Sequence, residues 1–174
     1  QFRGMIEALM RKGIHDEAEG PQLIRPQDLL EEGLALLHHN LFFKHHIQVK
    51  KEFVPALPPC RAPYADLGLA VWILLQNAVE AMETSPVKTL TLETGTDGDR
   101  VRLLVRDTGC GIPPEIQRRL FEPFLTTKKG KHPGLGLFIA RFVLREIGAD
   151  LAFFSREGET IFTIYLPTSV GRGN

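Results

Sequence analysis

The spacing of apolar residues predicts four helices in the central and C-terminal parts of the chain. Leucines recur at helical spacing through residues 26–41, with Pro26 near the first turn, where proline is favoured. Residues 65–83 are apolar on most faces, so we expect this helix to be mostly buried. Shorter helices are expected over 114–120 and 135–147.

Other segments alternate apolar and polar residues, as strands do. Residues 47–53 form one such segment, and 87–94 and 100–106 form two more, joined by the turn sequence GTDGD. Two final strands are expected over 150–155 and 160–166. Helices alternating with hairpins predict an α/β fold: a two-layer sandwich with one mixed sheet covered by helices on one face.

Both ends of the chain differ from this central part. Residues 1–13 carry apolar residues at helical spacing and end at Gly13, which is typical of the last turns of a helix with a glycine cap. Residues 14–23 are acidic and are interpreted as a linker, the domain itself is expected over 24–167, and 168–174 form a tail. Because the first residue is Gln rather than Met, we expect this chain to be part of a longer protein.

Within the domain, two segments lack periodic apolar patterns. The sequence PALPPCRAP, residues 55–63, is expected to break regular structure. Residues 121–134 are rich in Lys, Thr, Gly and Pro and predict a long loop.

Composition places the chain among ordinary globular domains. It has 174 residues, of which 43% are hydrophobic and 24% charged. The 21 basic residues equal the 21 acidic ones, so we expect no nucleic acid partner, which would require a basic excess. Two cysteines are too few for a disulfide framework, which suggests a reducing compartment such as the cytoplasm.

Two polar features interrupt these regular segments. Asn77 lies inside the apolar helix 65–83; it is either a core amide satisfied by the backbone or an oxygen ligand for Mg²⁺. Asp107 follows the strand 100–106 and precedes Gly109 and Gly111. This pattern is either an ordinary turn or a carboxylate beside glycines that let the backbone approach a ligand closely.

A third feature, residues 134–137 (GLGL), opens a helix directly after a basic loop. Free N–H groups at such a helix start attract phosphate, although a lone GxG is weak evidence. The pattern is not a dinucleotide-binding fingerprint, because Ile139 stands where GxGxxG requires its third glycine. No GxxxxGK[ST] phosphate loop occurs in the chain.

The order and spacing of these features resemble the nucleotide-binding boxes of sensor histidine kinase catalytic domains. That family also includes gyrase, heat-shock chaperone ATPases and mismatch-repair ATPases. The similar segments are LLQNAVEAM (74–82), DTGCGIP (107–113), LFEPFLTTK (120–128), GLGLFIARFVLREIGADL (134–151) and FTIYLP (162–167). The resemblance implies the Bergerat-type ATP-binding fold, with a largely antiparallel sheet, and the cofactors ATP and Mg²⁺.

Carried over residue by residue, the resemblance implies a binding site. It makes Asn77 the Mg²⁺ ligand, Asp107 the adenine-binding aspartate, and Phe121 and Phe124 the anchors of a lid. The full set implied for ATP binding is Asn77, Asp107, Gly109, Gly111, Ile112, Phe121, Phe124, Thr126, Thr127, Lys128, Gly134, Leu135, Gly136 and Leu137.

Two positions depart from the family pattern. Ile73 stands one turn before Asn77, where such kinases commonly have a second asparagine and the ATPase branches have a glutamate that activates water. His132-Pro133 replaces the first glycine before GLGL. Because Ile73 cannot accept a proton as that glutamate does, efficient ATP hydrolysis is not expected. The alternative to a kinase is a degenerate pseudokinase, a nucleotide-binding signalling module without phosphotransfer.

The resemblance also implies partners. The phosphoacceptor should be a histidine on a dimerisation domain, and residues 1–13 would be the C-terminal remnant of its helix. His15 is followed by Asp16 as in the acceptor motif, but the expected proline is displaced by one position, so we expect the acceptor outside this chain. A homodimer in the full-length protein and a response regulator receiver domain complete the implied set.

Overall fold

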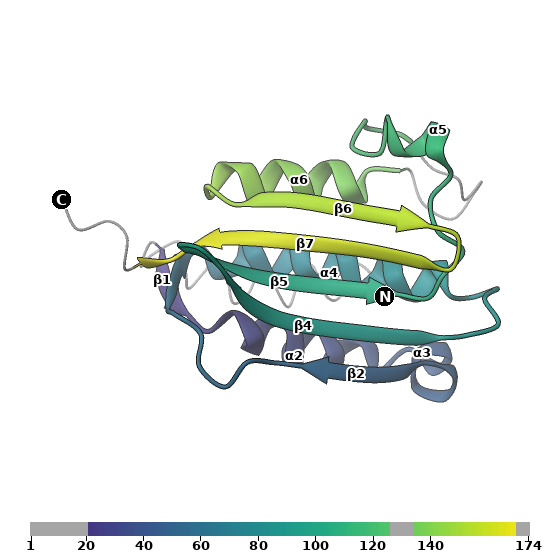
Figure 1. Ribbon diagram of the computed structural model, residues 1–174, viewed down its shortest axis with the longest axis horizontal. Coiled ribbons are helices and arrows are strands. Elements are labelled where there is room, and N and C mark those ends of the chain that lie inside the picture. Colours follow the sequence, from purple (N-terminus) through teal and green to yellow (C-terminus); the bar gives the residue numbers. More distant parts are fainter. Residues whose placement is uncertain (1–20, 126–133, 170–174) are drawn as a thin grey trace.

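The computed structural model describes residues 21–125 and 134–169, which form two layers (Figure 1). One layer is a five-stranded sheet of order β2-β4-β5-β7-β6. Its strands are β2 (Gln48–Glu52), β4 (Thr89–Asp97), β5 (Arg100–Asp107), β6 (Asp150–Arg156) and β7 (Glu159–Pro167). Only the pair β2 and β4 is parallel among the described strands. The prediction of a mixed, largely antiparallel sheet is confirmed.

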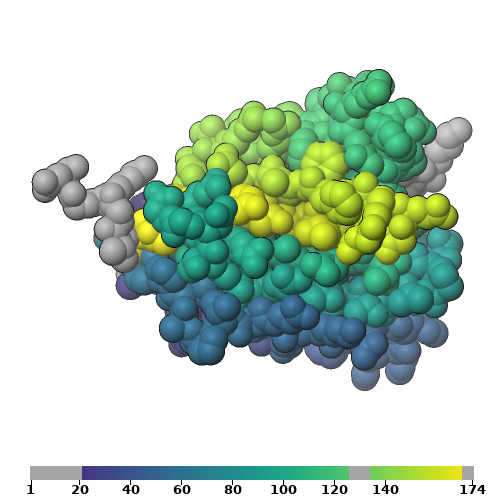
Figure 2. All heavy atoms as spheres, in the orientation of Figure 1, coloured from purple at the N-terminus to yellow at the C-terminus, as the bar shows by residue number. Residues whose placement is uncertain are grey.

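Helices make the second layer. They are α2 (Pro26–Leu37), α3 (Leu41–His46), α4 (Tyr64–Ala81), α5 (Pro114–Gln117) and α6 (Gly136–Glu146). The long helices α2, α4 and α6 lie behind the sheet in Figure 1. Figure 2, in the same orientation, shows that side chains of the strands form the opposite surface. Within residues 21–125 and 134–169, helices therefore cover one face of the sheet only, as predicted.

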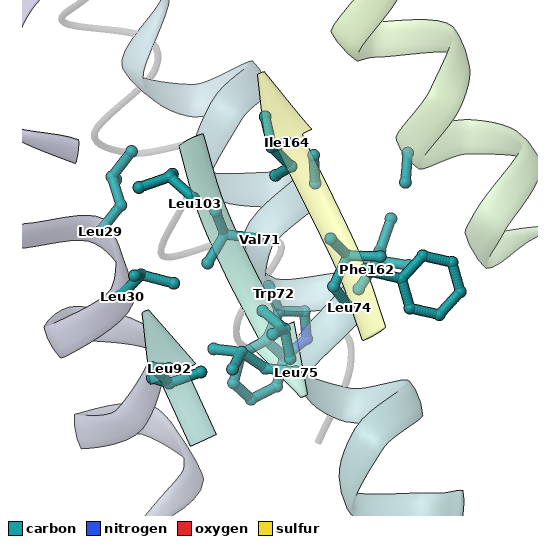
Figure 3. Close-up of a cluster of buried hydrophobic side chains, with 14 of the residues drawn as sticks. Leu29, Leu30, Val71, Trp72, Leu74, Leu75, Leu92, Leu103, Phe162 and Ile164 are labelled. Carbon is teal, nitrogen blue, oxygen red and sulfur yellow. The ribbon is translucent and has the colours of Figure 1, made fainter. Parts of the chain in front are cut away.

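The hydrophobic core lies between the layers and is centred on α4 (Figure 3). Leu30 of α2, Leu74 and Leu75 of α4 and Leu103 of β5 are almost completely buried. A Cβ atom at Gly33 of α2 would overlap the Leu75 side chain, so this glycine allows the two helices to approach closely. Contacts with α2, α6 and the sheet fix the rotation of α4 and thus the direction of its polar residues.

The predicted helix 26–41 is two helices, α2 and α3. The chain turns at His38 and His39, and the Asn40 side chain caps α3 by accepting the Phe43 N–H at 3.0 Å. Leu41 continues the leucine spacing by coincidence and is 71% exposed.

A two-stranded sheet was not predicted. β1 (Gln22–Ile24) pairs antiparallel with β3 (Cys60–Ala62). Positions 22 and 23, assigned to the linker, therefore pair with the domain, and regular structure occurs in the segment 55–63 that was expected to have none. Strands of three residues are too short to show an alternating pattern of their own.

Candidate functional site

One face of α4 contacts both glycine motifs. Ile73, Asn77 and Ala81 follow one another at four-residue spacing and so lie on the same face of the helix. Ile73 lies against Gly136 at the start of α6, and the Ala81 carbonyl accepts the N–H of Cys110 at 3.1 Å. Asn77 therefore lies between the contact with the loop after β5 and the contact with α6.

Asp107 is the last residue of β5 and its side chain is only 3% exposed. One carboxylate oxygen, Oδ1, accepts the Gly109 N–H at 2.8 Å. A Cβ at Gly109 would lie 2.6 Å from the Cβ of Ala81, so the absence of a side chain lets this turn press against α4. A carboxylate offers about four acceptor directions, so the turn interpretation and the ligand-binding interpretation of Asp107 are compatible.

The loop after Asp107 is held against the β6–β7 hairpin. Gly111 has a φ of +75°, and a Cβ there would overlap the backbone carbonyl of Arg156. The Ile112 N–H donates to Ser155 Oγ at 2.8 Å, and Gln117 Nε2 donates to the Ile112 carbonyl at 2.7 Å. Sequence reasoning missed Ser155 and Gln117, because neither belongs to a recognisable motif and their roles depend on contacts distant in sequence.

The amino end of α6 presents backbone donors. Leu135 is the N-cap residue and makes no side-chain capping bond, and the first helical bond runs from the Ile139 N–H to the Leu135 carbonyl at 2.9 Å. The N–H groups of Gly136 and Leu137 precede that bond and have no acceptor within the helix. Together with the helix dipole, they favour an anion at this position.

The two phenylalanines expected to anchor a lid behave differently. Phe121 packs edge-on against Phe153, with ring centroids 5.8 Å apart, and the Arg141 guanidinium lies 4.7 Å from the Phe121 ring centroid. Phe124 is 72% exposed and has a φ of +65°. Unlike Phe121, Phe124 does not pack against the described core, and its role as an anchor stays a prediction.

Several predicted residues lie outside the described part of the chain. These are Thr126, Thr127 and Lys128, the His132-Pro133 pair, and His15 with the whole of residues 1–13.

Asn77 is the only predicted metal ligand. Its side chain is half-buried and makes no hydrogen bond to the residues that the structure describes. Among those same residues, no group of three His, Cys, Asp or Glu could hold a metal ion. One amide oxygen fits Mg²⁺, which keeps several waters and binds through few protein ligands together with substrate phosphates.

The chain matches the family described as histidine kinase-, DNA gyrase B-, and HSP90-like ATPases over residues 63–170, and it belongs to this family. A curated relative is the sensory histidine kinase/phosphatase NtrB of Proteus hauseri, 33% identical over 165 residues, which cover 84% of this chain and 47% of NtrB.

Solved structures agree with this assignment. The catalytic domain of histidine kinase ThkA is 25% identical, with a TM-score of 0.75, over 86% of this chain and 96% of that domain. Full-length ShkA in complex with AMPPNP is 26% identical, with a TM-score of 0.73, over 86% of this chain and 31% of ShkA.

The chain spans less than half the length of the curated relatives that it matches. In residues 21–125 and 134–169, no helix has the length and apolar character needed to cross a bilayer.

Proposed function

We propose that this domain binds ATP with Mg²⁺ and transfers the terminal phosphoryl group to a histidine of a dimerisation domain in a two-component sensor kinase. The observation that carries the proposal is the convergence of three groups around one face of α4. They are the buried carboxylate of Asp107, the amide of Asn77 and the free N–H groups at the start of α6. An adenine amino group, a divalent cation and a phosphate chain are their chemical complements.

Each group has a defined task in this proposal. Asp107 accepts a hydrogen bond from the exocyclic amine of adenine, with Gly109, Gly111 and Ile112 beside the base. Asn77 holds Mg²⁺ through its Oδ1 atom, and the N–H groups of α6 bind the phosphates. Mg²⁺, when bound, neutralises negative charge on the phosphates. The bond from the γ-phosphorus to the bridging oxygen breaks, ADP leaves, and a P–N bond forms to the acceptor imidazole.

The acceptor domain also needs a surface on which to dock. Phe138 and Phe142 stack with ring centroids 6.5 Å apart and are 38% and 56% exposed on α6. Their exposed rings, next to the phosphate-binding end of the same helix, suit an apolar helix of the acceptor domain. A receiver domain then takes the phosphoryl group from that histidine.

The test has two arms. The chain alone, mixed with labelled ATP and Mg²⁺, should bind ATP in calorimetry and gain no phosphate. The protein together with its acceptor domain should gain acid-labile, base-stable phosphate, as phosphohistidine does. Binding without any phosphate in the second arm would favour the pseudokinase. Phosphohistidine on the chain alone would show that an acceptor lies within it, with His15 as the first candidate.

A further inference from the structure

Of the two glycines that the structure describes at the start of α6, Gly134 and Gly136, only Gly136 faces another helix. A Cβ atom added to Gly136 would lie 3.3 Å from Cγ2 of Ile73 on α4. Apart from its chain neighbours and the nearby backbone of α6 itself, it would meet no other described atom within 4 Å. At Gly134, by contrast, the added atom would meet the backbone of Leu125, and φ is +72°. The vacant side of Gly136 is thus directed at α4.

We infer that Ile73, and not the bound phosphate, is the reason for glycine at position 136, and that Ile73 positions the amino end of α6 relative to Asn77. The inference rests on the proposed function, because it assigns the phosphate-binding role to the N–H groups of α6. It gives Ile73, an aliphatic residue one turn before the proposed metal ligand Asn77, a role in placing the N–H groups of α6.

The packing of Ile73 makes it an effective spacer. Its side chain is only 4% exposed, and β-branching restricts rotation about χ1, so Cγ2 has little freedom to move away. Carbon atoms pack best at about 3.5–4.0 Å. A Cβ at 136 would therefore push the start of α6 away from α4 by a few tenths of an ångström, along with its N–H groups.

Such a shift affects binding, because functional groups must be held within about 0.5 Å of the productive geometry. Asn77 lies on the same face of α4 as Ile73, one turn further along. Moving α6 away from Ile73 therefore moves the phosphate donors away from the cation ligand. The two sites act on one ligand, so its affinity depends on their spacing.

The experiment is a double-mutant cycle on this chain, read by ATP affinity in calorimetry and by thermal melting. Gly136→Ala alone should weaken ATP binding about tenfold. Ile73→Ala removes Cγ2, so the Ile73→Ala/Gly136→Ala pair should bind ATP within about threefold of Ile73→Ala alone. Ile73→Val keeps a carbon at both γ positions, including the Cγ2 methyl, so Ile73→Val/Gly136→Ala should retain the defect.

Each outcome decides the inference. If Gly136→Ala is as harmful in the Ile73→Ala background as it is beside the native Ile73, the added methyl collides with the phosphate and the inference is wrong. Melting gives a second test that does not need the Ile73→Ala background: alanine favours helices over glycine, so Gly136→Ala should raise the melting temperature unless it collides with Ile73. A raised melting temperature with Ile73 in place would overturn the inference. Failure of the unchanged chain to bind ATP would instead refute the proposed function.

Discussion

The two ends of the α4 face that bears Asn77 are built from different kinds of contact. Near Ala81, the loop after β5 meets backbone: a Cβ at Gly111 would overlap the Arg156 carbonyl, and Cys110 donates to the Ala81 carbonyl. Near Ile73, a Cβ added at Gly136 would meet one side chain and, apart from its chain neighbours and α6 itself, no backbone among the described atoms, and the cap residue Leu135 makes no side-chain capping bond.

This difference separates recognition of the base from binding of the phosphates. Backbone atoms held in a sheet cannot move aside, so the shape of the Asp107 end is fixed before a ligand arrives. The start of α6 can shift against the Ile73 side chain, so the α6 end can be altered without unfolding the domain. Substitutions of the packed glycines at the Asp107 end should therefore act mainly on stability, and substitutions around α6 mainly on affinity.

The largest expected effect is at Gly111. Gly111→Ala should lower the free energy of unfolding by about 2 kcal/mol or more, because left-handed backbone and overlap with a fixed carbonyl act together. Gly148→Ala is the matched control, with a φ of +76° and no described atom within 4 Å of the added Cβ. Urea unfolding of both variants measures the difference. Equal losses would mean that the Arg156 contact yields and that this end is not rigid.

Asn77→Ala should have the next largest effect, on affinity alone. Loss of the amide oxygen should remove the dependence of ATP binding on Mg²⁺ and weaken binding at least about tenfold, equivalent to about 1.4 kcal/mol. Alanine favours helices, so melting of the unliganded chain should change little. Calorimetry with and without Mg²⁺ measures this, and an unchanged Mg²⁺ dependence would make Asn77 a structural amide.

Much of the fold was predictable because a long segment with a periodic apolar pattern shows both its type of element and which of its faces is buried. The predicted helix 65–83 corresponds to α4, and the strands 100–106 and 160–166 correspond to β5 and β7 within about two residues. The break at His38–Asn40 was not, because the leucine spacing continues through it to Leu41. In β1 and β3, three residues each were too few to give a period.

For the site, motifs identified which residues to consider but not what each one contacts. Gly111 and Arg156 are 45 positions apart, and only folding of the β6–β7 hairpin brings them together. The same motif reasoning treated Phe121 and Phe124 alike, although one packs on Phe153 and the other is exposed. Contacts between distant residues leave no local pattern to detect.

Asp107→Asn tests whether the rigid end selects the base. Adenine offers an amine to the carboxylate, whereas guanine places a carbonyl oxygen there, and an unpaired buried group costs about 1–3 kcal/mol. The unchanged chain should therefore prefer ATP over GTP by at least about tenfold. The asparagine amide can present either a donor or an acceptor, so the variant should lose most of this preference. Competition binding measures both ratios; a preference retained in Asp107→Asn would return Asp107 to a turn residue.

The smallest effects should come from the two cysteines, of which Cys110 reports on the Asp107 end. Cys110, in the loop after β5, is exposed, whereas Cys60 is fully buried and burial raises its pKa from 9.0 to about 11. Because the thiolate is the reactive form, one thiol should react with iodoacetamide at pH 8 in the folded chain and two should react in urea.

Bound ATP should slow the reaction of Cys110 severalfold, if the base lies beside Gly109 and Gly111. The burial of Cys60 is tested separately, by the pH dependence of the free energy of unfolding. Its raised pKa means that the folded state holds the proton more tightly than the unfolded state, so its contribution is complete below pH 9 and is lost as pH rises through about 11. Urea unfolding at pH 8 and pH 10.5 should therefore show a smaller fall for Cys60→Ala than for the unchanged chain. Protection of Cys110 by ATP but not by GTP would support the base at the Asp107 end, and equal labelling rates with and without ATP would move the base elsewhere.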